Sequence, residues 1–503
     1  MEREHSVLKV EAGREKACSR PQLGCSTPIK FSTIRLNIIY PMVMAIVLFL
    51  VVTQLLSLSG FGIKFWCTET TKVVGLETQL SPSLPQGSFL DENIDTSSID
   101  LRHGDVRLFK PHGLATYLYI DMSAYRGSPR HFSIVGLTAK SIEKHHKPPY
   151  ACEWVSSSND KVVKGHAYKI LPDWDYGKLY TVVVITCVFA EDVGTDGEGG
   201  ELVLYASYGD RYRQPERVVV LTEVKGEYNS SVFDTKSFPY DYVYCGSSVY
   251  GNISPQRMRE WMAYHAKFFG EKSHFILHDA GGFHEDVRKV LEPWIRQGRV
   301  TLQNIRQQEI YDGYYHNQFM VVNDCLFRSR FLANWTFFFD IDEYMYVDPS
   351  TTLSDVLNEK PDVSQIVIKQ VPIESGLCVA DNTRDQHERW LTERLIYRRV
   401  LKHGIHYDRK YAVQARHAEA TGIHMSMNLR RGKTRVLQDE RLRYYHYHGT
   451  ITNRGNLCNK FVDSKNKTAV KSVQLRLDET MMKMAKDVKS YELKMIGKQP
   501  FVL

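Results

Sequence analysis

Three carboxylates stand inside the stretch FFFDIDEYMYV (Phe337–Val347), which otherwise has the composition of a buried strand. Alternation along a strand would put Asp340 and Asp342 on one face and Ile341 on the other. Two like charges this close repel each other, and in an apolar setting one takes up a proton unless a cation lies between them. Such oxygen ligands suit Mg²⁺ or Mn²⁺ bridging a diphosphate. The stretch therefore predicts a divalent-metal site, with capping of the next turn or pairing with arginines as the structural alternative.

The segment from about Asp241 onward supplies the elements that would position these carboxylates. A strand ending in small residues leads to a helix with Ser254 as N-cap, Pro255 in its first turn and Gly270 at its end. Strands and helices then alternate, which predicts βαβ units and a parallel sheet. Ligands of such sheets bind at the carboxyl ends of the strands. The pieces are YVYCGSSVYG, NISPQRMREWMAYHAKFFG, SHFILHD, HEDVRKVLEPWIRQG and NQFMVVNDCLFRSR.

The preceding region, residues 106–228, has a different rhythm. Its short β-branched and aromatic runs alternate with period two and are separated by turn-rich pieces, which predicts an antiparallel β-sandwich. Cys152 and Cys187 fall in these strands and are candidates for a bridge between the sheets. Trp154, Trp174 and Tyr176 are candidates for stacking on a sugar ring, with a place in the core as the alternative for each.

An apolar run near the N-terminus predicts a membrane anchor at residues 36–60. Ile38–Leu58 carries no charge, and as a helix it would span about 31 Å, the thickness of the hydrocarbon core of a bilayer. The flanking Arg20, Lys30 and Arg35 favour a cytosolic tail at residues 1–35 and a lumenal remainder. The segment at 61–105 is rich in Ser, Thr, Pro and Gly and predicts a stem.

The cysteines and the sequons agree with a lumenal position of the chain after the anchor, and the charge bears on its partners. Seven of the nine cysteines follow the anchor without metal-type spacing, so we expect one to three disulfides and one thiol that is free or pairs between chains. N-glycosylation sequons lie at Asn229, Asn252, Asn334 and Asn466. The net charge of +7 is spread along the chain, which argues against a nucleic-acid partner.

The motifs YCGSSVYGN, HFILHD, NDC and DIDEY, in this order, resemble glycosyltransferase family 92. The resemblance implies a GT-A catalytic domain at 229–503, preceded by a β unit like a carbohydrate-binding module, in a single-pass type II Golgi protein. It further implies UDP-galactose as donor, Mn²⁺ (or Mg²⁺) as metal, and inverting transfer to O4 of a terminal galactose in the β-1,4-galactan of pectin. UDP-arabinopyranose as donor, another lumenal acceptor such as an N-glycan, an inactive polysaccharide-binding receptor and a homodimer are left open.

The resemblance also implies roles for individual residues. Asp340 and Asp342 would bind the metal with Glu343 in support. A third ligand would come from His446, which matches the histidine of the family's H-Y-R pattern, or from His448, which stands in place of its arginine. The expected nucleotide contacts are Cys245, Ser247, Val249, Asp279 and Asp340, with Arg454 or Lys460 on the diphosphate. The base is sought among Glu374, Asp381, Asp385 and Glu388, with Asp381 preferred, and Trp390 is a candidate for the acceptor subsite or the core.

Overall fold

The computed structural model describes residues 109–498, apart from 113–116, 141–147, 174–178, 210–211, 235, 312, 314, 381–388, 401–407, 438–439, 453–456, 466–469 and 471–473. The expected tail, anchor and stem therefore lie outside the described residues. Within the described ranges, no helix combines the length and the apolar character that crossing a membrane requires. All described residues belong to one compact unit, Asn93–Leu503.

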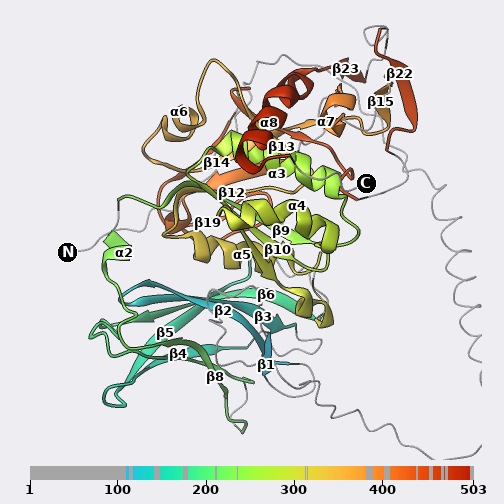
Figure 1. The fold of residues 1–503 in the computed structure, drawn as a ribbon. Helices are drawn as coiled ribbons and strands as arrows, with labels where there is room; N and C mark the ends of the chain where they lie inside the picture. Colours follow the sequence, from blue (N-terminus) through green and yellow to red (C-terminus); the bar gives the residue numbers. More distant parts are fainter. Residues whose placement is uncertain are drawn as a thin grey trace, which may run out of the picture. The chain divides into compact units, whose positions relative to one another are not determined.

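The first part of the described chain is a single antiparallel sheet of eight strands in the order β1-β2-β3-β6-β5-β4-β7-β8 (Figure 1). The sheet curls until its second and last strands meet: Arg126 of β2 donates two hydrogen bonds to Glu223 of β8, at 2.7 and 2.6 Å. The strands are β1 (Lys110–His112), β2 (Tyr119–Ser128), β3 (His131–Ala139), β4 (Tyr150–Ser156), β5 (Val162–Ile170), β6 (Tyr180–Phe189), β7 (Gly200–Ala206) and β8 (Glu216–Glu223).

The predicted two-sheet sandwich is not confirmed. The Cys152–Cys187 disulfide does form, and it joins β4 to β6 across the apolar inside of the curl. Hydrogen bonds nevertheless run through all eight strands as one sheet. A period-two sequence shows which side chains face inward, but it does not determine how many sheets the strands build.

A nine-stranded mixed sheet forms the second part, in the order β11-β10-β9-β12-β17-β14-β21-β13, with β20 beside β14. Strands β11, β10, β9 and β12 are mutually parallel, as the alternation of strands and helices predicts. The strands are β9 (Tyr240–Val249), β10 (Ser273–Asp279), β11 (Val300–Asn304), β12 (Ala333–Phe338), β13 (Glu343–Val347), β14 (Val363–Pro372), β17 (Arg409–Val413), β20 (Lys433–Val436) and β21 (Leu442–His446).

Helices cover both faces of this sheet. Helices α3 (Pro255–Phe269), α4 (Glu285–Arg296) and α8 (Thr480–Ile496) pack into the core on one face. On the other face lies α5 (Gln318–Ser329), which shares one apolar core with β2, β3 and β6 of the first sheet and is seen between the two sheets in Figure 1. The N-cap of α3 is confirmed, since the Ser254 side chain accepts a hydrogen bond from the N–H of Arg257 at 3.4 Å.

Short elements complete the described chain. Three two-stranded ribbons pair β15 (Leu377–Ala380) with β22 (Lys460–Asp463), β16 (Tyr397–Arg399) with β23 (Leu475–Leu477), and β18 (Ala418–Ala420) with β19 (Asn428–Leu429). The remaining helical segments are α2 (Ser231–Asp234), η1 (Arg306–Ile310), α6 (Leu353–Asn358), α7 (Leu391–Arg394) and η2 (Ala415–His417).

The expectation of one continuous strand through Phe337–Val347 is wrong. The chain leaves β12 after Phe338 and re-enters the sheet as β13 at Glu343. The two strands have different neighbours, because β12 pairs with β9 and β17 whereas β13 pairs with β21 at the far edge. The aspartates thus lie in a turn between two strands, and simple alternation does not determine their directions.

Candidate active site

The turn Asp340–Glu343, called the carboxylate turn below, is closed by two hydrogen bonds between its ends. The N–H of Glu343 donates to the carbonyl of Asp340 at 3.1 Å, and the N–H of Asp340 donates to Oε2 of Glu343 at 2.7 Å. Glu343 is 1 % exposed, and burial raises its pKa to about 8, although the charge of Lys410 acts in the opposite direction. Its side chain therefore shapes the turn from inside.

Lys410 of β17 provides a buried positive charge next to the carboxylate turn, and it was not predicted from the sequence. Its Nζ lies 2.6 Å from Oδ2 of Asp340 and 3.7 Å from Oε2 of Glu343, and its side chain is 4 % exposed. The other oxygen of Asp340 accepts a hydrogen bond from Oγ of Ser247 at 2.9 Å. Burial would raise the pKa of Asp340, but Lys410 and Ser247 together hold it below its ordinary value.

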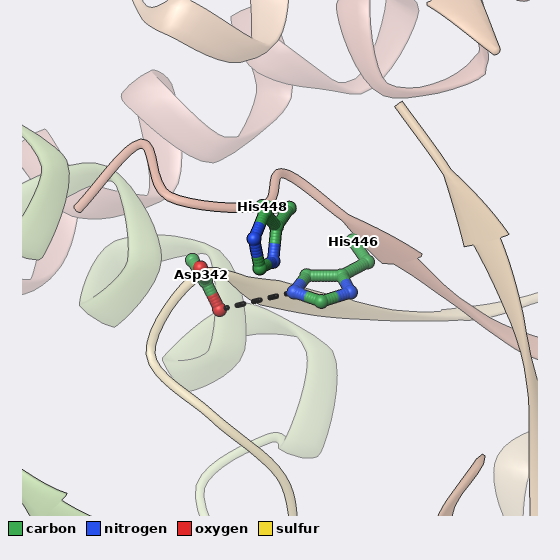
Figure 2. A group of neighbouring side chains, drawn as sticks. All are labelled: Asp342, His446 and His448. Carbon is green, nitrogen blue, oxygen red and sulfur yellow. Dashed lines mark ion pairs between the residues drawn. The ribbon is translucent and has the colours of Figure 1, made fainter. Parts of the chain in front are cut away.

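Asp342, His446 and His448 form a group that could hold a metal ion (Figure 2). One ligand atom from each lies within 4.8 Å of the others, and no other cluster of this kind occurs among the described residues. Nε2 of His446 lies 3.6 Å from Oδ1 of Asp342, while Oδ2 accepts a hydrogen bond from the N–H of Gly449 at 3.1 Å. Asp340 does not belong to this group.

Strand pairing and a glutamine fix the direction of His446. Its strand, β21, pairs with β13 so that His446 lies opposite Glu343, next to the carboxylate turn. Its Nδ1 lies 2.5 Å from Nε2 of Gln370, which leaves Nε2 directed at Asp342. Burial lowers the pKa of His446, but the hydrogen bond and charge of Asp342 outweigh this effect and raise it to about 9. A cation bound at Nε2 would replace that proton.

The end of β9 contains the predicted donor contacts. Ser247 directs its hydroxyl to Asp340, as described, and Val249 is buried with its carbonyl accepting the N–H groups of Ala280 and Gly282. Cys245 is bonded to Cys325 in the interior, so its side chain is committed to a disulfide. Of these three predicted side chains, only that of Ser247 reaches the carboxylate turn in the described structure.

Asp279, at the end of β10, is fully buried, and each of its two carboxylate oxygens has two partners. Its Oδ1 accepts the N–H groups of Gly281 and Phe283 at 2.9 and 3.2 Å. Its Oδ2 pairs with Arg288 at 2.7 Å and with Arg306 at 3.0 Å, and both guanidinium groups are about half exposed. Asp279 therefore holds two arginines at this edge of the sheet, which the sequence did not indicate.

A left-handed segment lies over the end of β9. Tyr315, His316 and Asn317 have φ values of 45°, 53° and 56°, a conformation that costs a non-glycine residue about 1–3 kcal/mol. The carbonyl of His316 accepts the hydroxyl of Ser248 at 2.7 Å, and its ring stacks on Tyr250 with centroids 3.9 Å apart. Strained backbone of this kind concentrates at functional sites, and here it borders the predicted donor strand.

The NDC motif of α5 connects the helix to three other parts of the chain. The amide of Asn323 donates to the carbonyl of Thr421 at 2.8 Å and accepts the N–H of the same residue at 2.8 Å. Oδ1 of Asp324 accepts the hydroxyl of Tyr125, from β2 of the first sheet, at 2.5 Å. Cys325 forms the disulfide with β9. These contacts of the motif hold the fold together.

The residues predicted to act as the base, to contact the diphosphate or to stack on a sugar are either outside the described residues or engaged elsewhere, except for Lys460. Asp381, Asp385 and Glu388 lie outside the described residues, as do Arg454, Trp174 and Tyr176. Glu374 pairs with Arg399 at 2.7 Å; burial would raise its pKa, but the bonds from Arg399 and the N–H of Gly376 hold it below its ordinary value, which suits a base poorly. Lys460 is exposed on β22. Trp390 and Trp154 are 3 % and 1 % exposed and belong to the apolar cores, so neither is available for stacking.

The expected disulfides are confirmed. Three are formed by the described cysteines, Cys152–Cys187, Cys245–Cys325 and Cys378–Cys458. Their pairing could not be deduced from the spacing. Cys67, the seventh cysteine after the predicted anchor, lies outside the described residues.

Comparison with known proteins identifies the family. Residues 240–487 match the sequence profile described as Glycosyltransferase family 92. Three relatives from Arabidopsis thaliana are named galactan beta-1,4-galactosyltransferases: GALS1 is 49 % identical over 78 % of this chain and 79 % of its own, GALS3 42 % over 88 % of each, and GALS2 44 % over 78 % and 76 %. Among solved structures, the galactosyltransferase LgtC aligns over 35 % of this chain and 58 % of its own, with 11 % identity and a TM-score of 0.20, which is too weak to support an argument. From the profile and these relatives, the chain belongs to glycosyltransferase family 92 and is a glycosyltransferase, as the resemblance of its motifs indicated.

Proposed function

We propose that this chain transfers galactose from UDP-galactose to O4 of the terminal galactose of β-1,4-galactan, with inversion, in a reaction that needs Mn²⁺. The observation that carries the proposal is the cluster of Asp342, His446 and His448 beside the carboxylate turn, in a chain 49 % identical to a galactan galactosyltransferase. One carboxylate and two imidazoles fit Mn²⁺ better than Mg²⁺, which prefers oxygen ligands.

Each residue of the site would have a separate role in binding the metal or in positioning the turn. Asp342 and the two histidines hold the metal, which when bound stabilises the charge of the departing UDP as a Lewis acid. Glu343 and Lys410 hold the carboxylate turn, and Ser247 orients Asp340. Positioning and charge stabilisation of this kind supply much of the acceleration in such transfers.

An α-linked donor and a β-linked product require a single displacement, in which a base takes the proton from O4. Asp381, Asp385 and Glu388 remain the predicted bases, with Asp381 preferred. Support comes from the path of the chain: Pro372, the last residue of β14, pairs with His446, and β15 (Leu377–Ala380), which follows a few residues later, leads directly into the segment that contains these candidates. Glu374 is poorly suited to this role because of its ion pair with Arg399.

We further propose that the protein is a type II Golgi membrane protein with its catalytic part in the lumen. The apolar run Ile38–Leu58 supports the anchor. Three disulfides among the described cysteines are in keeping with an oxidising compartment. A carbohydrate-binding role for the first sheet and a homodimer stay predictions.

The test is to incubate the purified full-length chain with UDP-galactose, Mn²⁺ and a short β-1,4-galactooligosaccharide and to follow the mass of the acceptor. We expect a ladder rising by single hexoses, abolished by EDTA and by Asp342→Ala, and retained by Asp362→Ala, which removes an exposed aspartate paired with Lys433. Parallel reactions use an N-glycan as acceptor or UDP-arabinopyranose as donor. Extension of the N-glycan only would replace galactan as the acceptor, and a ladder rising by single pentoses would establish UDP-arabinopyranose as a donor. Metal-independent binding of galactan without transfer would favour the receptor alternative.

A further inference from the structure

Lys410 separates the two aspartates of the carboxylate turn into different chemical environments. Both oxygens of Asp340 are engaged, Oδ2 by Lys410 at 2.6 Å and Oδ1 by Ser247 at 2.9 Å. Asp342 instead faces an imidazole, whose proton a metal ion can replace; its Oδ1 lies 3.6 Å from Nε2 of His446, as Figure 2 shows. A symmetric pair of metal-binding aspartates, which the D-x-D spacing suggests, is therefore not what the turn presents.

We propose that Lys410 is a positioning residue that keeps Asp340 out of the coordination shell of the metal, so that Asp342, His446 and His448 hold the ion without it. The inference deepens the proposed metal site and rests on the proposed function. The ammonium group of Lys410 then balances the charge of Asp340, and the metal ion binds only on the side of the turn where Asp342 lies.

The strand that carries Lys410 makes this arrangement rigid. β17 pairs with β12 through Thr336–Val413, Phe337–Ala412 and Phe338–Tyr411, which brings Lys410 alongside the residues that begin the turn. The next strand, β14, holds β17 from its other side, with Ile368 opposite Lys410. The ammonium group therefore reaches Asp340 from a backbone that the sheet fixes on both sides.

Charge complementarity explains why Asp340 would not be shared with a metal. A buried lysine needs a carboxylate partner, and breaking such a pair leaves an uncompensated buried charge. If Asp340 turned to the ion, Lys410 would keep only Glu343, at 3.7 Å, and a doubly positive ion would come close to its ammonium group. Both effects oppose coordination by Asp340.

The test measures binding of Mn²⁺ alone to the full-length chain, by electron paramagnetic resonance of the free ion, so that no turnover is involved. Losing a true ligand should weaken Mn²⁺ binding more than tenfold in Asp342→Asn, whereas Asp340→Asn should stay within about threefold of the wild type. In Lys410→Met, Asp340 is released and becomes available to the ion. Adding Asp340→Asn to that background should then cost about tenfold or more, a coupling that a double-mutant cycle detects. Lys410→Arg keeps the charge and should preserve the wild-type pattern.

Two outcomes are distinguishable failures. If Asp340→Asn weakens Mn²⁺ binding as much as Asp342→Asn does in the wild-type background, Asp340 is a ligand and the role assigned to Lys410 is wrong. If the wild-type chain binds no Mn²⁺, the proposed metal site is wrong and this inference falls with it. The comparison of the two asparagine variants needs no change at Lys410, so it decides the matter even where Lys410→Met fails to fold.

Discussion

Replacing Tyr125 by Phe should reveal how strongly the first sheet is bound to the catalytic one. The phenol of Tyr125 donates to the fully buried carboxylate of Asp324 at 2.5 Å and accepts from Arg328 at 3.0 Å. A hydrogen bond to a charged group contributes about 1.5–3 kcal/mol. Asp324 would keep its ion pair with Arg328 at 3.6 Å, so we expect a loss near the middle of that range, about 2 kcal/mol.

The assay is urea unfolding of the full-length chain, followed in parallel by far-UV circular dichroism and tryptophan fluorescence. Since α5 and strands β2, β3 and β6 share one apolar core, the two signals should change in a single transition in both proteins. The matched control is Tyr205→Phe, which removes a phenol bonded to Glu153 at 2.8 Å at a half-buried place within the first sheet. Its cost should stay below about 1 kcal/mol. The reasoning is refuted if Tyr125→Phe costs no more than this control, or if the sheets unfold in separate steps.

Three further predictions concern the catalytic part. Burial, only partly opposed by the Trp261 carbonyl, lowers the pKa of His265 to about 3, and its Nε2 accepts the N–H of Met345. Between about pH 6.5 and 3 the unfolded chain therefore binds a proton at this histidine that the folded chain does not bind. The free energy of unfolding of the wild type, relative to that of His265→Gln, should fall by about 1.4 kcal/mol for each pH unit from about 6 down to about 3, measured by urea unfolding. A side chain at Gly246 would place Cβ 2.1 Å from the hydroxyl of Tyr244, so Gly246→Ala should reduce transfer and weaken Mn²⁺ binding; unchanged values for both would contradict the crowding. Removing the Cys378–Cys458 disulfide by a double change to Ser should cost about 2–5 kcal/mol in unfolding free energy, and added reductant should then have less effect than on the wild type.

Features that depend on residues close together in the sequence could be predicted, whereas features that depend on contacts between distant segments could not. Local signals sufficed for α3, because the cap, the proline and the terminal glycine lie within its own segment. The parallel strands β9 to β12 followed from alternation of element types. Within the site, the carboxylates were singled out because D-x-D is unusual in an apolar stretch of sequence, and His446 and His448 were predicted from the resemblance to the family.

Other features of the site depend on contacts between segments that lie far apart in the sequence, and no local pattern predicts them. Lys410 follows Asp340 by 70 positions and comes from a strand whose antiparallel place in the sheet no local pattern predicts. The break between β12 and β13 could not be seen, since the residues on both sides of the turn are equally apolar and the two strands differ only in their neighbours. Asp279 was predicted as a nucleotide contact because it lies at the end of a strand, whereas its hydrogen bonds and ion pairs are made within the protein.

The pairing of β13 with β21 has a consequence for the order in which the molecule assembles. This edge pair joins residues roughly 100 positions apart, with Glu343 opposite His446, so its formation requires closure of a long stretch of chain, a step that slows folding. A shift of the pairing by one residue would turn His446 to the other side of the sheet. The parallel strands β9 to β12 can thus be paired while both histidines are still absent, and a chain stopped before β21 would lack two of the three residues of the proposed metal site. Catalytic competence, on this view, is acquired late and through the register of a single pair of strands.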